Sequence, residues 1–280
     1  MLISLKDVSF TYSAGTPFEN RALNGINLEI DKGEFVGIIG HTGCGKSTLI
    51  QVIAGLLTPE SGQVLIDGKD IFEKGYDRKQ LRRTLGVVFQ YPEYQLFEET
   101  VDLDISYGPR KAGYSEEETE EHVAWAYEQL GLNREALKEM SPFELSGGQK
   151  RKIAIAGVLA LRPDILVLDE PIAGLDPKGR NEFMAFVRSL REQGMTIIMI
   201  SHNMDGLAEE ATRILVMKNG EIVKDDTPKS VFTDTEMLES LSLGTSEAHE
   251  IAEMLKEKGI DQSVITYSEL LEELLRRYSS

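Results

Sequence analysis

One short segment combines glycines, a lysine and hydroxyl groups in the order that binds phosphate. It runs from Gly40 to Thr48 and matches the pattern G-x-x-x-x-G-K-[ST]. Glycines let backbone N–H groups curl around phosphate oxygens, and a helix N-terminus adds partial positive charge. Lys46 would reach the β- and γ-phosphates, and the Ser47 hydroxyl would bind Mg²⁺. The predicted nucleotide contacts are Gly40, His41, Thr42, Gly43, Cys44, Gly45, Lys46, Ser47 and Thr48.

Two adjacent carboxylates follow an apolar run later in the chain. Ile165–Leu168 is typical of a buried strand, and Asp169 and Glu170 come directly after it. In α/β proteins the carboxyl ends of strands bind ligands. Asp169 would hold Mg²⁺ through water, and Glu170 would polarise an attacking water as general base. Taken alone, this segment would be interpreted as a strand that runs into an acidic turn without a function. The presence of the phosphate loop elsewhere in the chain favours the catalytic and metal-binding roles instead.

Strands and helices alternate around both motifs. Phe35–Ile39 predicts a buried strand before the phosphate loop, and Thr48–Leu57 predicts a helix after it. Two further strands, Ile165–Leu168 and Thr196–Ile200, are separated by a helix over about 178–193. This alternation predicts a parallel α/β core.

The beginning of the chain has the pattern of antiparallel β structure. Leu2–Phe10 and Ala22–Ile30 are rich in apolar and β-branched residues. Asp67-Gly68 and Asn219-Gly220 each lie between two strand-like runs, and both pairs favour tight hairpin turns.

The middle and the end of the chain are predicted to be helical. Ser115 and Glu118 form a capping box at the start of a helix that ends near Leu130. Another helix runs from Ser146 to Arg162 and stops at a proline. The region 227–280 carries 11 acidic and 5 basic residues, and it is predicted to form helices over 247–257 and 267–277 without strands.

Composition excludes several classes of protein. The 280 residues include 47 acidic and 30 basic ones, a net charge of −17, which disfavours general binding to nucleic acid. A single cysteine excludes an intrachain disulfide. No apolar run approaches the roughly 20 residues of a membrane helix, and the N-terminus has no signal-peptide pattern. We expect an intracellular chain that needs another chain for any membrane-spanning part.

A third motif, Leu145 to Gln149, reads LSGGQ. Ser146, Gly147, Gly148 and Gln149 would begin a helix whose free N–H groups face an anion. A plain helix cap at Ser146 is the structural alternative. Together with the phosphate loop, LSGGQ resembles the ATP-binding cassette (ABC) family, and the resemblance covers about residues 1–226.

The resemblance implies a P-loop NTPase with a RecA-like core and an antiparallel β portion. A helical subdomain would span about 91–162, and 227–280 would be a C-terminal helical region for dimerisation or assembly. It also implies ATP and Mg²⁺ as ligands. In this family the LSGGQ segment contacts the γ-phosphate bound by the other subunit, so a working site needs a dimer.

Four more residues match positions of the family in order. Gln90 resembles the glutamine that touches Mg²⁺ or the attacking water. Tyr12 resembles the aromatic residue that stacks on adenine. Asp176 resembles the dimer-seam aspartate, and His202 resembles the switch histidine on the γ-phosphate. The resemblance gives catalytic roles to four residues: Glu170, Lys46, His202 and Gln90. It gives metal-binding roles to Ser47, Gln90 and Asp169.

Two segments narrow the resemblance to the ATPases of energy-coupling factor (ECF) importers, which are CbiO-like. Residues 89–101 are similar to the segment after Gln90 in these ATPases, and 15–23 is similar to the second of their two paralogous ATPases. This implies a motor at the cytoplasmic face of the membrane that drives uptake of a vitamin or a transition-metal ion. Its partners would be a second ATPase, a transmembrane coupling protein and a substrate-binding membrane protein. Leu96 and Phe97 are candidates for the coupling surface, with core residues as the equal alternative.

Two residues depart from the family pattern. Ile172 stands where threonine is usual, and Cys44 stands where serine is usual. We expect Cys44, at a helix N-terminus, to react with thiol reagents.

A soluble ABC ATPase acting on nucleic acid or ribosomes is the alternative function, although the chain has one LSGGQ and no sustained heptads. A GTPase would need N-K-x-D, which is absent, and the intact set of catalytic residues disfavours a module without turnover. The choice between homodimer and paralogous heterodimer stays open, with the heterodimer favoured.

Overall fold

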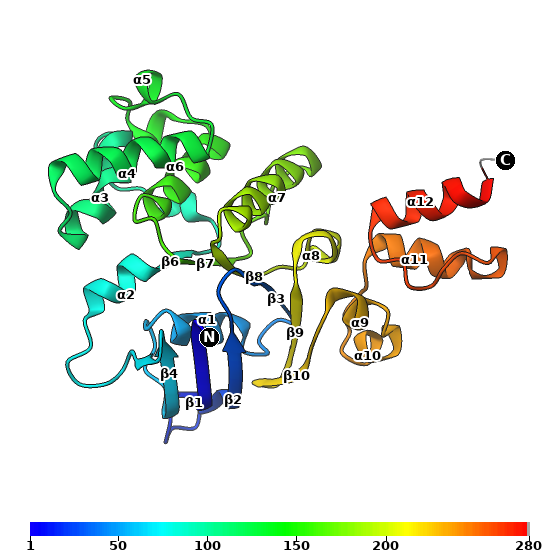
Figure 1. Ribbon diagram of the computed structural model, residues 1–280. Coiled ribbons are helices and arrows are strands. Elements are labelled where there is room, and N and C mark those ends of the chain that lie inside the picture. The colour runs from blue at the N-terminus through cyan, green and yellow to red at the C-terminus, as the bar shows by residue number, and fades with distance from the viewer. Residues whose placement is uncertain (279–280) are drawn as a thin grey trace. The chain divides into compact units, whose positions relative to one another are not determined.

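The computed structural model describes residues 1–278, and the chain divides into two compact units. The first unit combines Met1–Asp70 with the chain from Ile198 onward, and the second is Ile71–Ile197. Strand β8 (Thr196–Ile200) crosses from the second unit into the first (Figure 1). No helix in the described part of the chain has the length and apolar character to cross a membrane.

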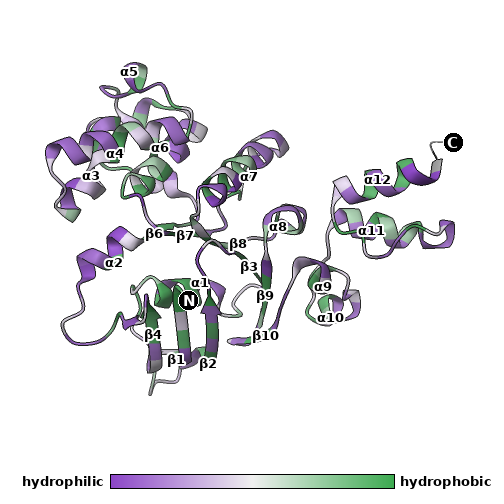
Figure 2. Cartoon of the chain, in the orientation of Figure 1, coloured by the Kyte–Doolittle hydropathy of each residue, from purple (hydrophilic) through white to green (hydrophobic). Residues whose placement is uncertain are grey.

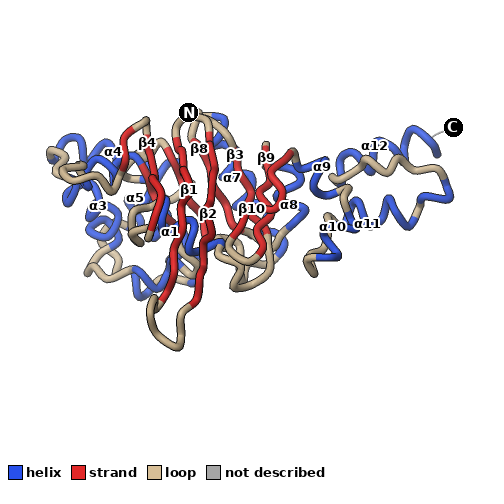
Figure 3. Tube along the Cα trace, turned by 90° about the horizontal axis from the view of Figure 1, so that it is seen from below, coloured by secondary structure: helices blue, strands red, loops and turns tan. Residues whose placement is uncertain are grey.

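The first unit begins with a four-stranded antiparallel sheet in the order β2-β1-β4-β5, and Figure 3 shows β1, β2 and β4 side by side. Apolar side chains of β1 lie opposite apolar partners on both neighbours. Leu5 pairs with Leu28 on one side and with Val64 on the other. Such cross-strand pairs stabilise a sheet and fix its register. The strands are β1 (Ile3–Tyr12), β2 (Asn20–Ile30), β4 (Ser61–Ile66) and β5 (Lys69–Asp70).

A second set of strands in this unit holds the phosphate loop. β3 (Phe35–Ile39) is buried along its whole length and pairs in parallel with β9 (Arg213–Lys218). β9 pairs antiparallel with β10 (Glu221–Asp226). The helices α1 (Lys46–Ile53) and α8 (Met204–Glu210) complete this part. The continuous apolar run of β3 is typical of a strand that is covered on both faces.

Both predicted hairpins are present. Asp67 and Gly68 have φ of 48° and 73°, and Asn219 and Gly220 have φ of 49° and 80°. Positive φ at both central residues is the geometry that favours Asn-Gly and Asp-Gly in tight turns. The turn chemistry therefore explains why the sequence alone indicates these connections.

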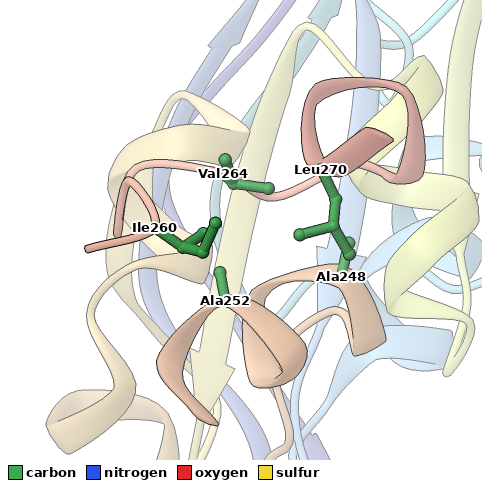
Figure 4. Close-up of a cluster of buried hydrophobic side chains, with 5 residues drawn as sticks. All are labelled: Ala248, Ala252, Ile260, Val264 and Leu270. Carbon is green, nitrogen blue, oxygen red and sulfur yellow. The ribbon is translucent and has the colours of Figure 1, made fainter. Parts of the chain in front are cut away.

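The C-terminal region is helical, as predicted. Its elements are α9 (Pro228–Phe232), α10 (Thr235–Ser240), α11 (Glu247–Met254), η3 (Lys256–Lys258) and α12 (Tyr267–Tyr278). Five buried side chains pack together between α11 and α12, as Figure 4 shows: Ala248, Ala252, Ile260, Val264 and Leu270. A hydrogen bond also links α11 to the segment before α12, because the Nδ1 of the buried His249 ring donates to the Val264 carbonyl at 2.9 Å. Asp205 in α8 accepts the Glu247 N–H at 2.8 Å and so joins α11 to the residues after β8.

The second unit contains a parallel pair of strands and most of the long helices (Figure 1). Its elements are α2 (Arg78–Thr84), β6 (Leu85–Val88), η1 (Pro92–Gln95), α3 (Val101–Ala112), α4 (Glu116–Gln129), α5 (Arg134–Leu137), η2 (Pro142–Glu144), α6 (Gly147–Leu159), β7 (Ile165–Asp169) and α7 (Pro177–Glu192). β6 and β7 pair in parallel. The Arg134 guanidinium binds Asp102 of α3 at 2.8 Å and also binds Glu120 of α4.

Capping residues set the helix starts of this unit, at α4 as the sequence predicts and at α7 through a residue that was not predicted to cap. Ser115 and Glu118 form a complete capping box at α4, and Asp176 accepts the Gly179 N–H at 2.7 Å at the start of α7. The predicted ends are less accurate, because α6 stops at Leu159 rather than Arg162. Helix α2 is polar along nearly all of its length (Figure 2), which explains why apolar spacing does not predict it.

Candidate nucleotide-binding site

Two glycines of the phosphate loop stand where no side chain fits. A Cβ on Gly40 would lie 2.4 Å from the Met217 carbonyl oxygen, and one on Gly45 would lie 2.4 Å from the Ala22 carbonyl oxygen. Their φ values of 151° and 110° are also unfavourable for side chains. The loop therefore needs glycine at both ends, and its backbone packs closely on β2 and β9.

Helix α1 begins at this loop with its first N–H groups open. The residue that caps it, Gly45, has no side chain, so it offers no side-chain oxygen to the N–H groups of the first turn. Uncapped N–H groups and the helix dipole together favour an anion. The residues that are present fit the phosphate groups of a nucleotide.

Lys46 holds the loop closed upon itself. Its Nζ donates to the Gly40 carbonyl at 2.6 Å and to the His41 carbonyl at 3.0 Å. The residue is only 7% exposed. A buried ammonium group needs acceptors, and phosphate oxygens are stronger acceptors than carbonyls. The lysine is therefore already placed inside the loop that the sequence assigns to phosphate.

Cys44 differs from the sequence-based expectation. Its side chain is 1% exposed, and its sulfur lies against the backbone at Gly40. Its carbonyl accepts the Gly220 N–H at 2.9 Å. A thiol in this position is shielded from reagents by the loop itself, so the expected ready reaction with thiol reagents is wrong for this conformation.

Tyr12 and His202 lie in the same unit as the phosphate loop. The Tyr12 hydroxyl is 3.3 Å from the Thr48 Oγ1, and its ring packs edge-on against Phe10 with centroids 4.8 Å apart. Tyr12 therefore stands at the first turn of α1 with its ring partly exposed. His202 is exposed two residues after the end of β8, before Asn203, whose side chain caps α8.

The two carboxylates of the second unit lie at the end of β7, as predicted. Asp169 is buried as the last residue of the strand, and Glu170 follows with φ of 49°. A non-glycine residue in this left-handed region is uncommon, and such positions gather at functional sites. Ile172 is buried, so the residue that departs from the family pattern packs as an apolar side chain.

The LSGGQ segment starts α6 with a capping box. The Ser146 N–H donates to the Gln149 Oε1 at 3.1 Å, and the Gln149 N–H donates to the Ser146 Oγ at 3.4 Å. A Cβ on Gly147 or Gly148 would meet no atom within 4 Å. The capping role of Ser146 is thus present, and the two glycines beside it form an open surface.

The comparison of the sequence with family models decides which family these motifs represent. Residues 23–173 match the model of the ABC transporter family. The chain is 50% identical over 278 residues to the "Energy-coupling factor transporter ATP-binding protein EcfA2" of Clostridium perfringens, covering 98% of both chains. It is 47% identical to the protein of the same name in Clostridium tetani, covering 100% of this chain and 98% of that one. The chain belongs to the energy-coupling factor group of ABC transporter ATP-binding proteins.

Solved structures agree with this ABC ATPase fold. A structure titled cbiO1 from Clostridium perfringens, part of the ABC transporter complex cbiONQ, superposes with a TM-score of 0.75 at 37% identity. It covers 91% of this chain and 98% of that one. A dimeric post-hydrolysis ATP-binding cassette bound to ADP and Pi gives 0.71 at 31% identity, over 81% of this chain and 99% of that one. The fold prediction is confirmed.

The predicted site residues of this ABC ATPase fall into two sets, one in each unit. The first unit holds Tyr12, the phosphate loop and His202, and the second unit holds the others. They are Gln90, Ser146, Gly147, Gly148, Gln149, Asp169, Glu170 and Asp176. Gln90 is exposed after β6 and precedes Tyr91, whose φ of 56° turns the chain into η1. The Asp176 side chain caps α7.

One charged residue of this ABC ATPase was missed by the sequence analysis. Arg151 of α6 is buried and paired with Glu93 of η1. It stands four residues before Ile155 and eight before Leu159, both on the buried face of the helix. A charge at helical spacing within an apolar stripe is the signal that could have indicated a buried ion pair.

Proposed function

We propose that this chain is the ATP-hydrolysing motor subunit of an ECF-type importer for a vitamin or a transition-metal ion. It would act at the cytoplasmic face of the membrane with a second, paralogous ATPase, a transmembrane coupling protein and a substrate-binding membrane protein. The observation that carries the proposal is the presence on one chain of an uncapped phosphate loop and an open LSGGQ surface. The two clostridial relatives, both named energy-coupling factor transporter ATP-binding protein EcfA2, support the same function.

Each set of residues has a defined role in this proposal. The N–H groups of α1 and the Lys46 ammonium would bind the phosphates of ATP, and Tyr12 would stack on adenine. Glu170 would accept a proton from the attacking water as general base, with Gln90 and His202 orienting the water and the γ-phosphate. Mg²⁺, when bound, would neutralise phosphate charge. Ser47, Gln90 and Asp169 carry oxygen ligands of the kind that Mg²⁺ prefers.

The LSGGQ surface supports the proposal of a second ATPase. Helix α6 begins at Gly147 with two glycines that no other side chain covers. Backbone N–H groups at such a helix start favour a phosphate brought by another chain. Asp176, exposed at the start of α7, would lie at the seam of the same dimer.

An aromatic surface in the second unit supports docking of the transmembrane coupling protein. Phe97 is 57% exposed and packs edge-on against Tyr107 of α3, whereas Leu96 is 8% exposed. The choice between coupling surface and core therefore differs for the two residues: Leu96 packs inside as a core residue, whereas Phe97 faces outward and is available for docking. Exposed aromatic residues are typical anchors of protein interfaces.

A groove beside Phe97 has the size to accept side chains of a helix. Its volume is about 310 Å³, and Leu96, Tyr107, Ile153 and Leu161 are among its lining residues. Asp104 lies at one side and accepts the N–H groups of Phe97 and Glu98, both at 3.1 Å. Burial raises the pKa of this carboxyl above its ordinary value. The groove is therefore mainly apolar, with Arg82, Gln95 and Asp104 as polar lining residues, which suits an amphipathic helix.

Replacing Phe97 with aspartate should release the chain from the membrane complex. Loss of an exposed aromatic anchor typically costs about 2 kcal/mol or more, which is about 30-fold in affinity. The measurement is copurification of the full chain with the coupling protein and the second ATPase. The control is Met140→Asp, since Met140 is also exposed in this unit but does not line the groove. Unchanged copurification of Phe97→Asp would contradict the docking site.

The C-terminal region supports an assembly role for 227–280. Tyr267, Leu271 and Leu275 of α12 are all exposed, and their spacing of four residues puts them on one helix face. The neighbouring face of α12 packs Leu270 into the buried cluster of this region (Figure 4). We propose that the exposed stripe binds the corresponding region of the second ATPase.

A further inference from the structure

Arg151 is a buried cation that joins three segments of the second unit. Its side chain is 7% exposed. Its Nε donates to the Glu93 Oε2 at 3.2 Å, and its Nη1 donates to the Ala173 carbonyl at 3.0 Å. The guanidinium therefore bonds to groups from η1 and from the loop after β7, while its own backbone belongs to α6.

Each partner stands next to a residue with a proposed role in hydrolysis. Glu93 is three residues after Gln90, and Arg151 is two residues after Gln149. Ala173 is three residues after Glu170, and its N–H donates to the Glu170 carbonyl at 3.2 Å. The turn that carries Glu170 is thus closed by one backbone bond and held from outside by Arg151.

The geometry of this contact requires arginine. A guanidinium presents several N–H donors in fixed directions, so one side chain can bond a carboxylate and a carbonyl at once. A lysine in this position would keep the charge but would lack that planar fork. The Glu93 carboxylate, whose side chain is 19% exposed, also depends on the cation, because a largely shielded charge without a partner is unfavourable.

We propose that Arg151 is a positioning residue for ATP hydrolysis, which holds the turn of Glu170 and the segment after Gln90 against the LSGGQ helix. The proposal rests on the proposed roles of Glu170 and Gln90. A displaced Glu170 turn slows the site of this chain, and a displaced LSGGQ helix slows the site shared with the second ATPase. The contact includes no residue of the phosphate loop, so ATP binding at that loop does not depend on it.

The test is Arg151→Lys in the full chain, assayed with the second ATPase. The kcat for ATP should fall about 10- to 100-fold, since small displacements of catalytic groups have effects of this size. The KM for ATP and the melting temperature should stay near those of the unaltered chain. The matched control is Arg162→Lys, because Arg162 forms a surface pair with Glu121 at 2.9 Å in the same unit. This control should leave kcat unchanged.

A double-mutant cycle with Glu93→Gln separates positioning from general loss of structure. Arg151→Lys and Glu93→Gln together should lower kcat by less than the product of their separate effects, since both act through one contact. Full kcat in Arg151→Lys, or exact multiplication of the two effects, would overturn the proposal. A fall in melting temperature that accounts for the lost kcat would also overturn it. The role of Glu170 is tested separately by Glu170→Gln, so failure of that role is distinguishable.

Discussion

ATP turnover should fall by about 10²–10⁴-fold when Glu170 is replaced by glutamine, with ATP binding unchanged. The amide keeps the size of the side chain but cannot accept the proton of the attacking water. Glu170 stands directly after Asp169 at the end of β7, in a left-handed turn that fixes its direction. Binding persists because the phosphate loop, in the other unit, is unaltered.

Turnover should be counted at the site of this chain alone. We therefore pair the Glu170→Gln chain with a second ATPase whose own phosphate-loop lysine has been replaced, and measure phosphate release at saturating Mg-ATP. Glu182→Gln is the control, because Glu182 is an exposed carboxylate on α7 of the same unit. Full turnover in Glu170→Gln would remove the residue from its role as general base.

The second large effect is expected from Lys46→Met, which should weaken ATP binding by roughly 10²-fold or more. Hydrogen bonds to charged groups contribute about 1.5–3 kcal/mol each, and two such bonds to phosphate correspond to about 10²–10⁴-fold. In the structure the ammonium bonds the Gly40 and His41 carbonyls. Since ATP replaces these bonds, we expect the lower part of the range.

The measurement for Lys46→Met is the dissociation constant for ATP by titration calorimetry. Lys178→Met is the matched control, because Lys178 is an exposed lysine on α7 with a weak contact to Glu182 at 3.8 Å. The melting temperature checks that the loop still folds. A dissociation constant within about threefold of the unaltered chain would mean that phosphate does not bind at this loop.

Much of the fold follows from local signals in the sequence. Turn residues with positive φ mark the two hairpins, a capping box marks α4, and a continuous apolar run marks β3. Each of these features is decided within a few residues, so pattern and position suffice. The same holds for the phosphate loop, whose glycines meet the backbone of neighbouring strands.

Features that depend on distant partners could not be predicted in this way. The two hydrogen-bond partners of Arg151 lie 58 and 22 residues away in the chain, and no local sequence pattern around Arg151 indicates which residues they are. The burial of Cys44 depends on how β9 and the loop pack together. Helix α2 has almost no apolar face, so its existence depends on capping by Asp77 rather than on periodicity.

The central claim is that a second ATPase completes the site of this chain. The Glu170→Gln variant suits its test, because slow hydrolysis preserves the ATP-bound pair. A variant with Leu271→Asp and Leu275→Asp tests the exposed stripe of α12 in the same experiment, and Leu56→Asp is its control. Leu56 is likewise exposed in the first unit but lies outside α12.

The most direct measurement is the mass, by light scattering, of Glu170→Gln mixed with the second ATPase. With Mg-ATP we predict a complex of one copy of each chain. The pair should form less readily with the altered α12 stripe and normally with Leu56→Asp. Two chains that stay separate at saturating Mg-ATP, or homodimers of this chain that exclude the second ATPase, would contradict the account.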